Sequence, residues 1–549
     1  MQLKNVFFLF CCLLNSASLS AQVPELVKDI FAGGSGIDIY NPVMTEYKGQ
    51  VFFSGRDTTY GTELWCSDGT DAGTKMVKDV WNGQGNSYPR NLIEFNGFLY
   101  FSAYDVSHGE ELWISDGTDA GTYLLKDINV GTASGSPKAF TAYNNKLYFS
   151  ANNGMNGFEL WVTDGTTLGT NLVKDINPGA GFSFPAGYIH FNGLLYFSAF
   201  DNAHGYELWT SDGTAAGTQL FKDINLGLND GYPFSQDRTI YDGKLYFSAS
   251  DGSNGYELWV TDGSVSGTQM VTDIHPGSSG SFPSRLMTWN NVLFFTAGDG
   301  IHGTELWRSD GSVAGTQLIK DIKPGPLGGV NANLVVYNAK LFFAANDGIN
   351  GQELWSSDGT DTGTHIVVDL RSGLGDSYPI NYKVYHGKLY FVATANNAEG
   401  YQLFQYDDGS GLTNLIAPAN PFLHACTDND IDAFSQLTIA FETLLYPAYY
   451  DTLLMELYKI TTPVGLDDEQ ELNEIQIFPN PTSQSIKIKL GESKITNFQI
   501  IDMYGNLLMN DSTFKNESIE IDVSKFASGM YVIQLQTTKG MLHTKFVKN

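Results

Sequence analysis

Short apolar runs separated by turn residues recur along most of the chain. One unit, read from Phe282, consists of FPSRLMTWNN, VLFFTAGD, ELWRSDG and GTQLIKDI, which we call strands A, B, C and D. Each run is rich in aromatic and β-branched residues and is bounded by Gly, Asn, Asp or Pro, as is typical of strands. Strand B, as in Leu195–Ala199, is almost wholly apolar, so we expect both of its faces to be covered.

The runs return at a fixed spacing. The string ELWTSDGTAAGT at Glu207–Thr218 occurs seven times in recognisable form, and its tryptophans are separated by 48, 48, 48, 50, 48 and 48 residues. Such a period is typical of repeat architectures in which neighbouring units cover each other. The sequence therefore predicts an all-β fold over residues 22–462, a closed β-propeller of four-stranded blades. We expect the repeated tryptophans to pack between blades; they are Trp65, Trp113, Trp161, Trp209, Trp259, Trp307 and Trp355.

The strand count predicts nine blades. Strand B begins nine times, and strand C also occurs nine times if Gln402–Phe404 and Glu456–Tyr458 are degenerate copies. Strand D follows the first eight C strands, and Leu26–Ile30 at the start of the array can supply the ninth. This pairing of the first strand with the last blade would remove exposed sheet edges. Eight blades are the alternative, if residues 415–462 form something other than a blade.

The turns between strands have the composition of tight hairpins. Asn96-Gly97 and its equivalents connect strands A and B, and such pairs favour positive φ. Asp116-Gly117 and its equivalents connect strands C and D, where Asp caps the turn and Gly takes the left-handed conformation. We interpret these regular Asp residues as turn chemistry rather than as catalytic groups.

Charge and leader composition indicate an exported protein. Lys and Arg total 31 against 60 Asp and Glu, a net charge of −29. This argues against nucleic acid and anionic lipid as partners, because phosphate binding needs clustered Lys and Arg. Residues 1–21 are typical of a secretory signal peptide, with Lys4, an apolar run over Val6–Leu14 and a small-residue exit at Ser18–Ala21. We find no later stretch suited to a transmembrane helix and expect a soluble, exported protein.

Two cysteines lie beyond the leader, Cys66 and Cys426. An oxidising compartment permits a disulfide between them, although two lone cysteines are more often unpaired.

The B–C loops are the candidate metal sites. Six of them place an Asp six residues before a Glu around a Gly turn, and oxygen side chains in such a loop can hold Ca²⁺. The spacing is not that of an EF-hand, and a metal-free hydrogen-bonded hairpin is the interpretation we favour. His108, His204 and His302 share one position in alternate blades, too far apart to bind one metal easily. The weak calcium candidates are Asp105, Glu111, Asp201, Glu207, Asp251, Glu257, Asp299, Glu305, Asp347 and Glu353.

We expect neither catalytic residues nor a cofactor. The chain has no Gly-rich phosphate loop, no HExxH, no CxxC and no Ser nucleophile elbow.

The end of the chain differs in composition from the array. Residues 463–474 hold five acids in twelve positions and no aromatic residue, which predicts a linker. Residues 475–549 contain alternating strands with short turns, which predicts a small β-sandwich. The expected strands are Ile475–Phe478, Ser485–Leu490, Asn497–Asp502, Ile519–Asp522, Met530–Gln536 and His543–Val547.

Residues 22–462 resemble the family of exported bacterial proteins named for its ELWxxDGTxxGT repeat. The match is close at Glu111–Thr122, Glu159–Thr170 and Glu207–Thr218, weakens at Ser264 and Ser312, and fails in blades eight and nine. This resemblance implies a fold more than an activity.

Residues 475–549 resemble the type A sorting domain of the type IX secretion system found in Bacteroidetes. The resemblance implies that secretion machinery recognises this unit and moves the folded cargo from the periplasm across the outer membrane. It also implies cleavage, which we expect in the acidic linker, and then release or attachment to the outer-membrane surface. The matching residues are Pro479, Asn480, Pro481, Tyr504, Gly505, Gly529, Tyr531, Lys545, Phe546, Val547 and Lys548, together with Phe478, Met530 and Val532.

Three functions are compatible with these features. The first is a non-enzymatic module that binds a glycan or a protein, with its ligand on the B–C and D–A loops, which emerge on one face. The second is a polysaccharide-acting hydrolase or lyase, although an active site is normally unique and these acids recur in every blade. A unique site would have to lie near Asp428, Asp430 and Asp432. The third is a structural surface protein without a specific ligand.

Overall fold

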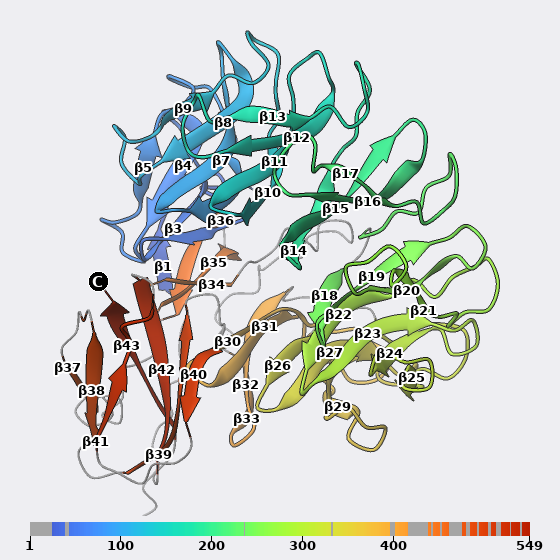
Figure 1. The fold of residues 1–549 in the computed structure, drawn as a ribbon. Coiled ribbons are helices and arrows are strands. Elements are labelled where there is room, and N and C mark those ends of the chain that lie inside the picture. The colour runs from blue at the N-terminus through green and yellow to red at the C-terminus, as the bar shows by residue number, and fades with distance from the viewer. Residues whose placement is uncertain are drawn as a thin grey trace, which may run out of the picture. The chain divides into compact units, whose positions relative to one another are not determined.

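The computed structural model consists of two units built from strands (Figure 1). It describes residues 25–460 with gaps at 39–42, 235–236, 331–332, 396–400, 415–436, 441–442 and 451–452. It also describes residues 475–548 with gaps at 479–481, 483, 491–493, 503–506, 512–517, 527–528 and 538–540. The compact units are Met1–Thr461 and Thr462–Asn549. The predicted leader and linker lie outside the described residues, as do Cys426 and the three aspartates that follow it.

The first unit contains nine antiparallel four-stranded sheets within its described residues. Each sheet has strands A, B, C and D as neighbours, and Figure 1 shows the sheets arranged around a central axis with strand A innermost. Blades 1 to 5 comprise β2 (Thr45–Tyr47), β3 (Gln50–Asp57), β4 (Gly61–Ser67), β5 (Lys75–Lys78); β6 (Arg90–Phe95), β7 (Phe98–Asp105), β8 (Gly109–Ser115), β9 (Tyr123–Lys126); β10 (Lys138–Tyr143), β11 (Lys146–Asn152), β12 (Phe158–Thr163), β13 (Asn171–Lys174); β14 (Ala186–Phe191), β15 (Leu194–Asp201), β16 (Gly205–Ser211), β17 (Gln219–Lys222); and β18 (Arg238–Tyr241), β19 (Lys244–Ser250), β20 (Tyr256–Thr261), β21 (Gln269–Thr272). Blades 6 to 9 comprise β22 (Ser284–Trp289), β23 (Val292–Gly298), β24 (Thr304–Ser309), β25 (Gln317–Lys320); β26 (Val335–Tyr337), β27 (Lys340–Asn346), β28 (Gln352–Ser357), β29 (His365–Val368); β30 (Ile380–Tyr385), β31 (Lys388–Ala393), β32 (Gln402–Asp407), β33 (Gly411–Asn414); and β34 (Thr438–Ala440), β35 (Thr443–Tyr450), β36 (Leu453–Ile460), β1 (Glu25–Lys28). The predicted all-β propeller is confirmed, and the blade number is the nine of the strand count.

The ninth blade takes its fourth strand from the start of the array. Strand β1 pairs antiparallel with β36, with Glu25 opposite Lys459. Lys28 on β1 donates a hydrogen bond to the carbonyl of Thr74 in blade 1, at 3.0 Å. Lys174 makes the same bond from blade 3 to the carbonyl of Thr218 in blade 4, at 2.8 Å. The first strand therefore contacts blade 1 as strand D of blade 3 contacts blade 4.

Apolar cores lie between neighbouring sheets, as the apolar B strands predict. Leu195 and Phe197 of β15 are fully buried, and they pack with Tyr148 of blade 3. Equivalent clusters connect every successive pair of blades. One further cluster joins Val27 and Met455 of blade 9 to residues of blade 1. All seven repeated tryptophans lie buried in these cores. Truncation of one such tryptophan to Ala should lower the free energy of unfolding by about 3–5 kcal/mol.

The DGTxxGT half of the repeat forms the C–D turn. Oδ1 of Asp116 accepts hydrogen bonds from the N–H and the hydroxyl of Thr118, at 2.8 and 2.7 Å. A Cβ at Gly121 would meet that carboxylate at 2.0 Å, so only glycine fits there. The hydroxyl of Thr122 donates to the Thr118 carbonyl at 2.6 Å and lies 2.7 Å from the Ser115 hydroxyl. These aspartates have the turn role that was predicted for them.

The second unit is a small β-sandwich, as predicted. Its sheets are β37-β38-β41 and β40-β39-β42-β43. They share one core, to which β38 contributes Ile486 and β42 contributes Ile533. The strands are β37 (Ile475–Phe478), β38 (Ser485–Leu490), β39 (Ile495–Asp502), β40 (Leu507–Asp511), β41 (Ser518–Asp522), β42 (Gly529–Thr537) and β43 (Met541–Lys548). The sequence prediction missed β40, which pairs with β39 along one edge of the four-stranded sheet.

Candidate binding site

The chain order of the strands fixes which connections share a face of the propeller. Because each blade is an antiparallel meander, the B–C and D–A connections emerge together, opposite the A–B and C–D turns. The A–B turns are two-residue turns such as Asn96-Gly97, with φ of 50° and 79°. The D–A connections are longer; the one between β13 and β14 spans residues 175–185. We call the side that carries the B–C and D–A connections the loop face.

In eight of the nine blades, a buried glutamate holds the D–A connection against strand C. Glu159 is fully buried, and its carboxylate accepts hydrogen bonds from the Ile176 N–H at 2.8 Å and the Ser183 hydroxyl at 2.6 Å. Glu207 accepts three backbone N–H groups, from Ile224, Asn225 and Gly231. Burial raises the pKa of both carboxyls to about 7, against the opposing effect of these hydrogen bonds. The same position does this in six further blades, whereas blade 8 has Gln402 there; the glutamates are Glu63, Glu111, Glu257, Glu305, Glu353 and Glu456.

The aspartates of the calcium candidates cap the B–C turns. Oδ1 of Asp105 accepts the N–H groups of Ser107 and His108, at 2.7 and 2.8 Å. Asp201, Asp251, Asp299 and Asp347 make equivalent bonds. Each Asp and each Glu thus has its own set of N–H donors, whereas Ca²⁺ requires converging oxygens. In the described part of the chain, no group of three or more His, Cys, Asp or Glu is placed to hold a metal ion. The calcium candidates stay a prediction.

The three repeated histidines take part in the same turns. Nδ1 of His108 lies 2.7 Å from Oδ2 of Asp105, and this hydrogen bond raises the histidine pKa. His204 and His302 have the same arrangement in blades 4 and 6. In blade 5, the Asn254 amide donates to Oδ2 of Asp251 in the equivalent place, at 2.8 Å. Both residue types therefore brace the turn.

Stacked aromatic pairs on the loop face were not predicted from the sequence. In blades 3, 4 and 5, the residue before the strand C glutamate is aromatic and stacks on an aromatic of the D–A connection. Ring centroids of Tyr206 and Tyr232 lie 5.0 Å apart with planes 22° from parallel. Tyr256 and Phe282 lie 5.3 Å apart at 26°, and Phe158 and Phe184 lie 5.3 Å apart at 23°.

These D–A aromatics have an unusual backbone conformation. Phe184, Tyr232 and Phe282 have φ of 43°, 42° and 51°, in the left-handed region that bulky residues rarely adopt, and each precedes a proline. Their N–H groups donate to strand C carbonyls; the Tyr232 N–H reaches the Tyr206 carbonyl at 3.0 Å. The surrounding hydrogen bonds therefore hold a conformation that costs about 1–3 kcal/mol per residue.

The pairs lie in three adjacent blades, and Phe200 connects the first two. Phe200 of blade 4 donates its N–H to the Ser183 carbonyl at 2.8 Å, and its ring lies 5.3 Å from Tyr206. A hydrogen bond to Asp230 and burial raise the pKa of Tyr232 to about 12, with smaller contributions from Tyr206 and from Tyr256 of blade 5. We call this set of residues the aromatic track; it comprises Phe158, Phe182, Phe184, Phe200, Tyr206, Tyr232, Tyr256 and Phe282.

The aromatic track is exposed and ends on both sides. Phe182, Phe184, Tyr232 and Phe282 are 44%, 37%, 38% and 54% exposed. In blade 2 the paired positions hold Glu110 and Ser136, and in blade 6 they hold Thr304 and Val330. The stacking is thus a property of three adjacent blades rather than of the repeat. The available signal in the sequence was an aromatic residue both before the Glu of ELW and before the proline of the D–A connection.

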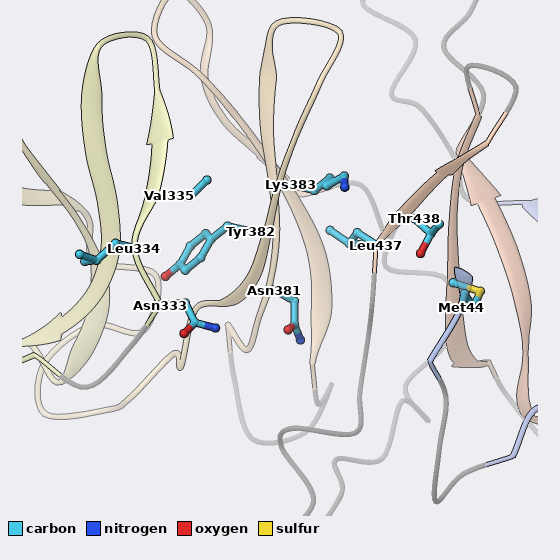
Figure 2. Close-up of a pocket in the computed structure, with 9 residues that line it drawn as sticks. All are labelled: Met44, Asn333, Leu334, Val335, Asn381, Tyr382, Lys383, Leu437 and Thr438. Atoms are coloured by element: carbon cyan, nitrogen blue, oxygen red, sulfur yellow. The ribbon is translucent and has the colours of Figure 1, made fainter. Parts of the chain in front are cut away.

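A hollow lies at the inner strands of blades 7, 8, 9 and 1 (Figure 2). It has a volume of about 480 Å³. Its polar lining includes the amides of Asn333 and Asn381 and the ammonium of Lys383. The Tyr382 hydroxyl, also in the lining, already donates to the Pro379 carbonyl at 2.9 Å. The apolar part consists of Met44, Leu334, Val335 and Leu437, with Thr438 beside them.

The candidate sorting residues of the second unit are described in part. Strands β42 and β43 pair Gly529 with Lys548 and Tyr531 with Phe546, and the two rings stack at 5.3 Å inside the core. Lys545 and Val547 also lie on β43. Pro479, Asn480, Pro481, Tyr504 and Gly505 lie outside the described residues. In the first unit, Cys66 is fully buried on β4, and burial raises its pKa to about 11.

Comparison with known proteins identifies the second unit. Residues 476–549 match the family model described as the secretion system C-terminal sorting domain. No curated protein matches the chain. The protein is therefore exported by the type IX route, to the cell surface or the medium. Where the chain is described, none of its segments is a helix suited to spanning a bilayer.

Solved structures with a similar arrangement include a variant of puromycin hydrolase, at 12% identity and a TM-score of 0.34. A prolyl endopeptidase is similar at 10% identity and a TM-score of 0.37, and a puromycin-hydrolyzing peptidase of Mycobacterium tuberculosis at 10% and 0.34. The matches cover 66%, 74% and 66% of this chain, which in turn spans 59%, 54% and 58% of those chains. Likeness of this size carries no information on activity.

Proposed function

We propose that the protein is a non-enzymatic binding module of the bacterial surface or medium, which holds a glycan or protein ligand on the loop face of blades 3 to 5. The aromatic track is the observation that carries this proposal. Clusters of exposed apolar side chains on a protein surface often mark binding sites. Here the rings are held in fixed orientations by stacking and by the left-handed backbone, so little side-chain entropy is lost when a ligand binds.

The distribution of the acidic residues supports a binding function rather than that of a polysaccharide hydrolase or lyase. The strand C glutamates bind backbone N–H groups and the B–C aspartates cap turns, as in blade 4, so both sets serve the fold wherever they occur. The aromatic track, in contrast, breaks the repeat. On a repeated scaffold, side chains that differ between otherwise equivalent blades can give one part of the surface a specific function.

The test is sedimentation of the full chain with intact cells and extracellular matrix of the producing organism. We expect the double variant Tyr232→Ala/Phe282→Ala to lose most of the bound fraction. The matched control is Leu168→Ala/Val313→Ala, which removes exposed apolar side chains from the C–D turns on the opposite face. Equal binding by both variants, or loss only in the control, would overturn the proposal, and no binding by the wild-type protein would favour a structural role.

A further inference from the structure

We infer that the ligand of the aromatic track is a linear polysaccharide whose sugar rings stack on three successive subsites, one in each of blades 3, 4 and 5. This rests on the proposed function, because it names the ligand class for the same surface. The subsites are the stacked pairs Phe158/Phe184, Tyr206/Tyr232 and Tyr256/Phe282.

Each pair has the geometry that a sugar ring requires. One ring of the pair packs on strand C, and the ring on the D–A connection remains half-exposed, as with Phe282 at 54%. A pyranose has one face made of C–H groups with small positive partial charges. The face of an aromatic ring is negative, so the two surfaces attract while the hydroxyls at the sugar's edge stay solvated.

The repetition of the subsites favours a polymer with a repeating unit. Equivalent sequence positions form the three pairs, so neighbouring subsites are related by the rotation from one blade to the next. A linear polysaccharide presents sugar-ring faces at regular intervals along its length. Contacts at linked subsites raise the total affinity, because the second and third rings bind intramolecularly. A folded protein of non-repetitive sequence has no corresponding regular spacing of surface groups.

Polar groups beside the rings suit hydroxyl recognition. Asp230 accepts the Tyr206 N–H at 2.8 Å and a hydrogen bond from the Tyr232 hydroxyl, so it fixes the rim of the central subsite. At the blade 3 end, the Lys138 ammonium lies 4.5 Å from the Phe158 ring centroid and 5.5 Å from that of Phe184. This cation can donate to ring or hydroxyl oxygens of a sugar stacked there.

Charge selects among polymers that stack on aromatics. Single-stranded nucleic acid also stacks on such rings, but its binding sites combine them with a positive groove. This chain has a net charge of −29. Repulsion of the same kind disfavours densely anionic polysaccharides. We therefore assign a neutral or sparsely charged polysaccharide to the aromatic track.

The test is affinity electrophoresis of the full chain in gels that contain neutral β-glucan, xylan or mannan, with alginate as the densely anionic comparison. We expect retardation by at least one neutral polymer. Phe184→Ala, Tyr232→Ala and Phe282→Ala should each weaken that affinity by roughly 5- to 30-fold, the size of a lost aromatic contact. Tyr232→Phe keeps the ring and should stay within about 3-fold of wild type.

Tyr88→Ala is the matched control for backbone effects. Tyr88 has the same left-handed conformation before a proline, with φ of 44°, but Thr62 replaces the aromatic partner on strand C. It should leave polysaccharide affinity unchanged. Equal losses in Tyr88→Ala and Tyr232→Ala would attribute the effect to loop damage and overturn the inference.

Treatment of cells and matrix with periodate or with protease distinguishes failure of this inference from failure of the proposed function. Periodate cleaves the vicinal diols of 1,4-linked sugars, so it should abolish track-dependent binding to a 1,4-linked polysaccharide, and protease treatment of the matrix should not. Track-dependent binding that survives periodate and is lost on proteolysis would overturn the polysaccharide inference and keep the binding function, with a protein as ligand. If all three alanine variants bind polysaccharide as tightly as wild type, both the polysaccharide inference and the proposed function are overturned.

Discussion

Glu207→Gln isolates the contribution of one buried carboxylate to the aromatic track. Glu207 accepts N–H groups from Ile224 at 2.7 Å, Asn225 at 3.1 Å and Gly231 at 2.9 Å, and Gly231 directly precedes Tyr232. Glutamine has nearly the same shape, but its amide nitrogen cannot accept a hydrogen bond. At least one backbone N–H would then face another donor inside a fully buried site.

The size of the effect follows from that lost bond. A hydrogen bond to a charged group contributes about 1.5–3 kcal/mol, which converts to roughly 10- to 150-fold faster opening of the connection. Hydrogen exchange at pH 8, where Glu207 is ionised, measures this opening in peptides that cover residues 223–232. We expect faster exchange there and weaker binding on the aromatic track.

Glu305→Gln is the matched control in blade 6. Glu305 accepts the Gly329 N–H at 3.0 Å in the same way, but its D–A connection carries Val330 in place of an aromatic. This variant should accelerate exchange only in residues 321–330 and leave binding intact. Unchanged exchange in residues 223–232 of Glu207→Gln, or the same acceleration throughout the propeller, would refute the role of these glutamates as local clamps.

Three further predictions concern the propeller as a whole. The free energy of unfolding should fall as pH rises from about 5 through 7, because burial raises the pKa of glutamates such as Glu207 from 4.5 to about 7 in the folded state, where the ionised form is disfavoured. In urea unfolding, the free energy of Glu207→Gln should fall less steeply, by up to about 3 kcal/mol over that range. An identical slope in wild type and variant would count against this prediction. Thermal unfolding should be the same in EDTA and in Ca²⁺, since Asp105 and Glu111 already bind N–H groups, whereas a shift of several degrees restored by Ca²⁺ would establish the calcium candidates. Deletion of residues 22–30 should lower the melting temperature and promote self-association in light scattering, because it exposes the edge of β36; a monomer of unchanged stability would contradict the role of β1.

The fold was accessible from sequence because its signals are local and repeated. The apolar B strands, the Asn-Gly turns and the 48-residue spacing of Trp113 and Trp161 each report on one blade, and repetition reinforces them. Strand β40 was missed in the second unit, where no repeat supports a short edge strand.

The candidate site was accessible only in part. Strand order alone predicted that the B–C and D–A connections would emerge on one face of the propeller. The role of Glu111 was not visible, because a carboxylate that binds metal and one that binds the N–H of Ile128 look the same in a sequence. The aromatic pairs were missed for the opposite reason: they are departures from the repeat, and their partners are about 26 residues apart, as in Tyr206 and Tyr232.

The left-handed site before the proline shows how this scaffold separates fold from recognition. Tyr88, Ser136 and Tyr378 have the same positive φ as Tyr232, and their N–H groups also donate to a strand C carbonyl. The strained backbone is therefore common to blades whose side chains differ from aromatic to serine, and the buried glutamate beside it is common as well. Since neither feature depends on the side chain presented, that side chain can change without loss of the blade. The fold therefore does not require aromatic residues at this site and on strand C in three adjacent blades. This is why we seek the ligand at the aromatic track rather than at the repeated acids.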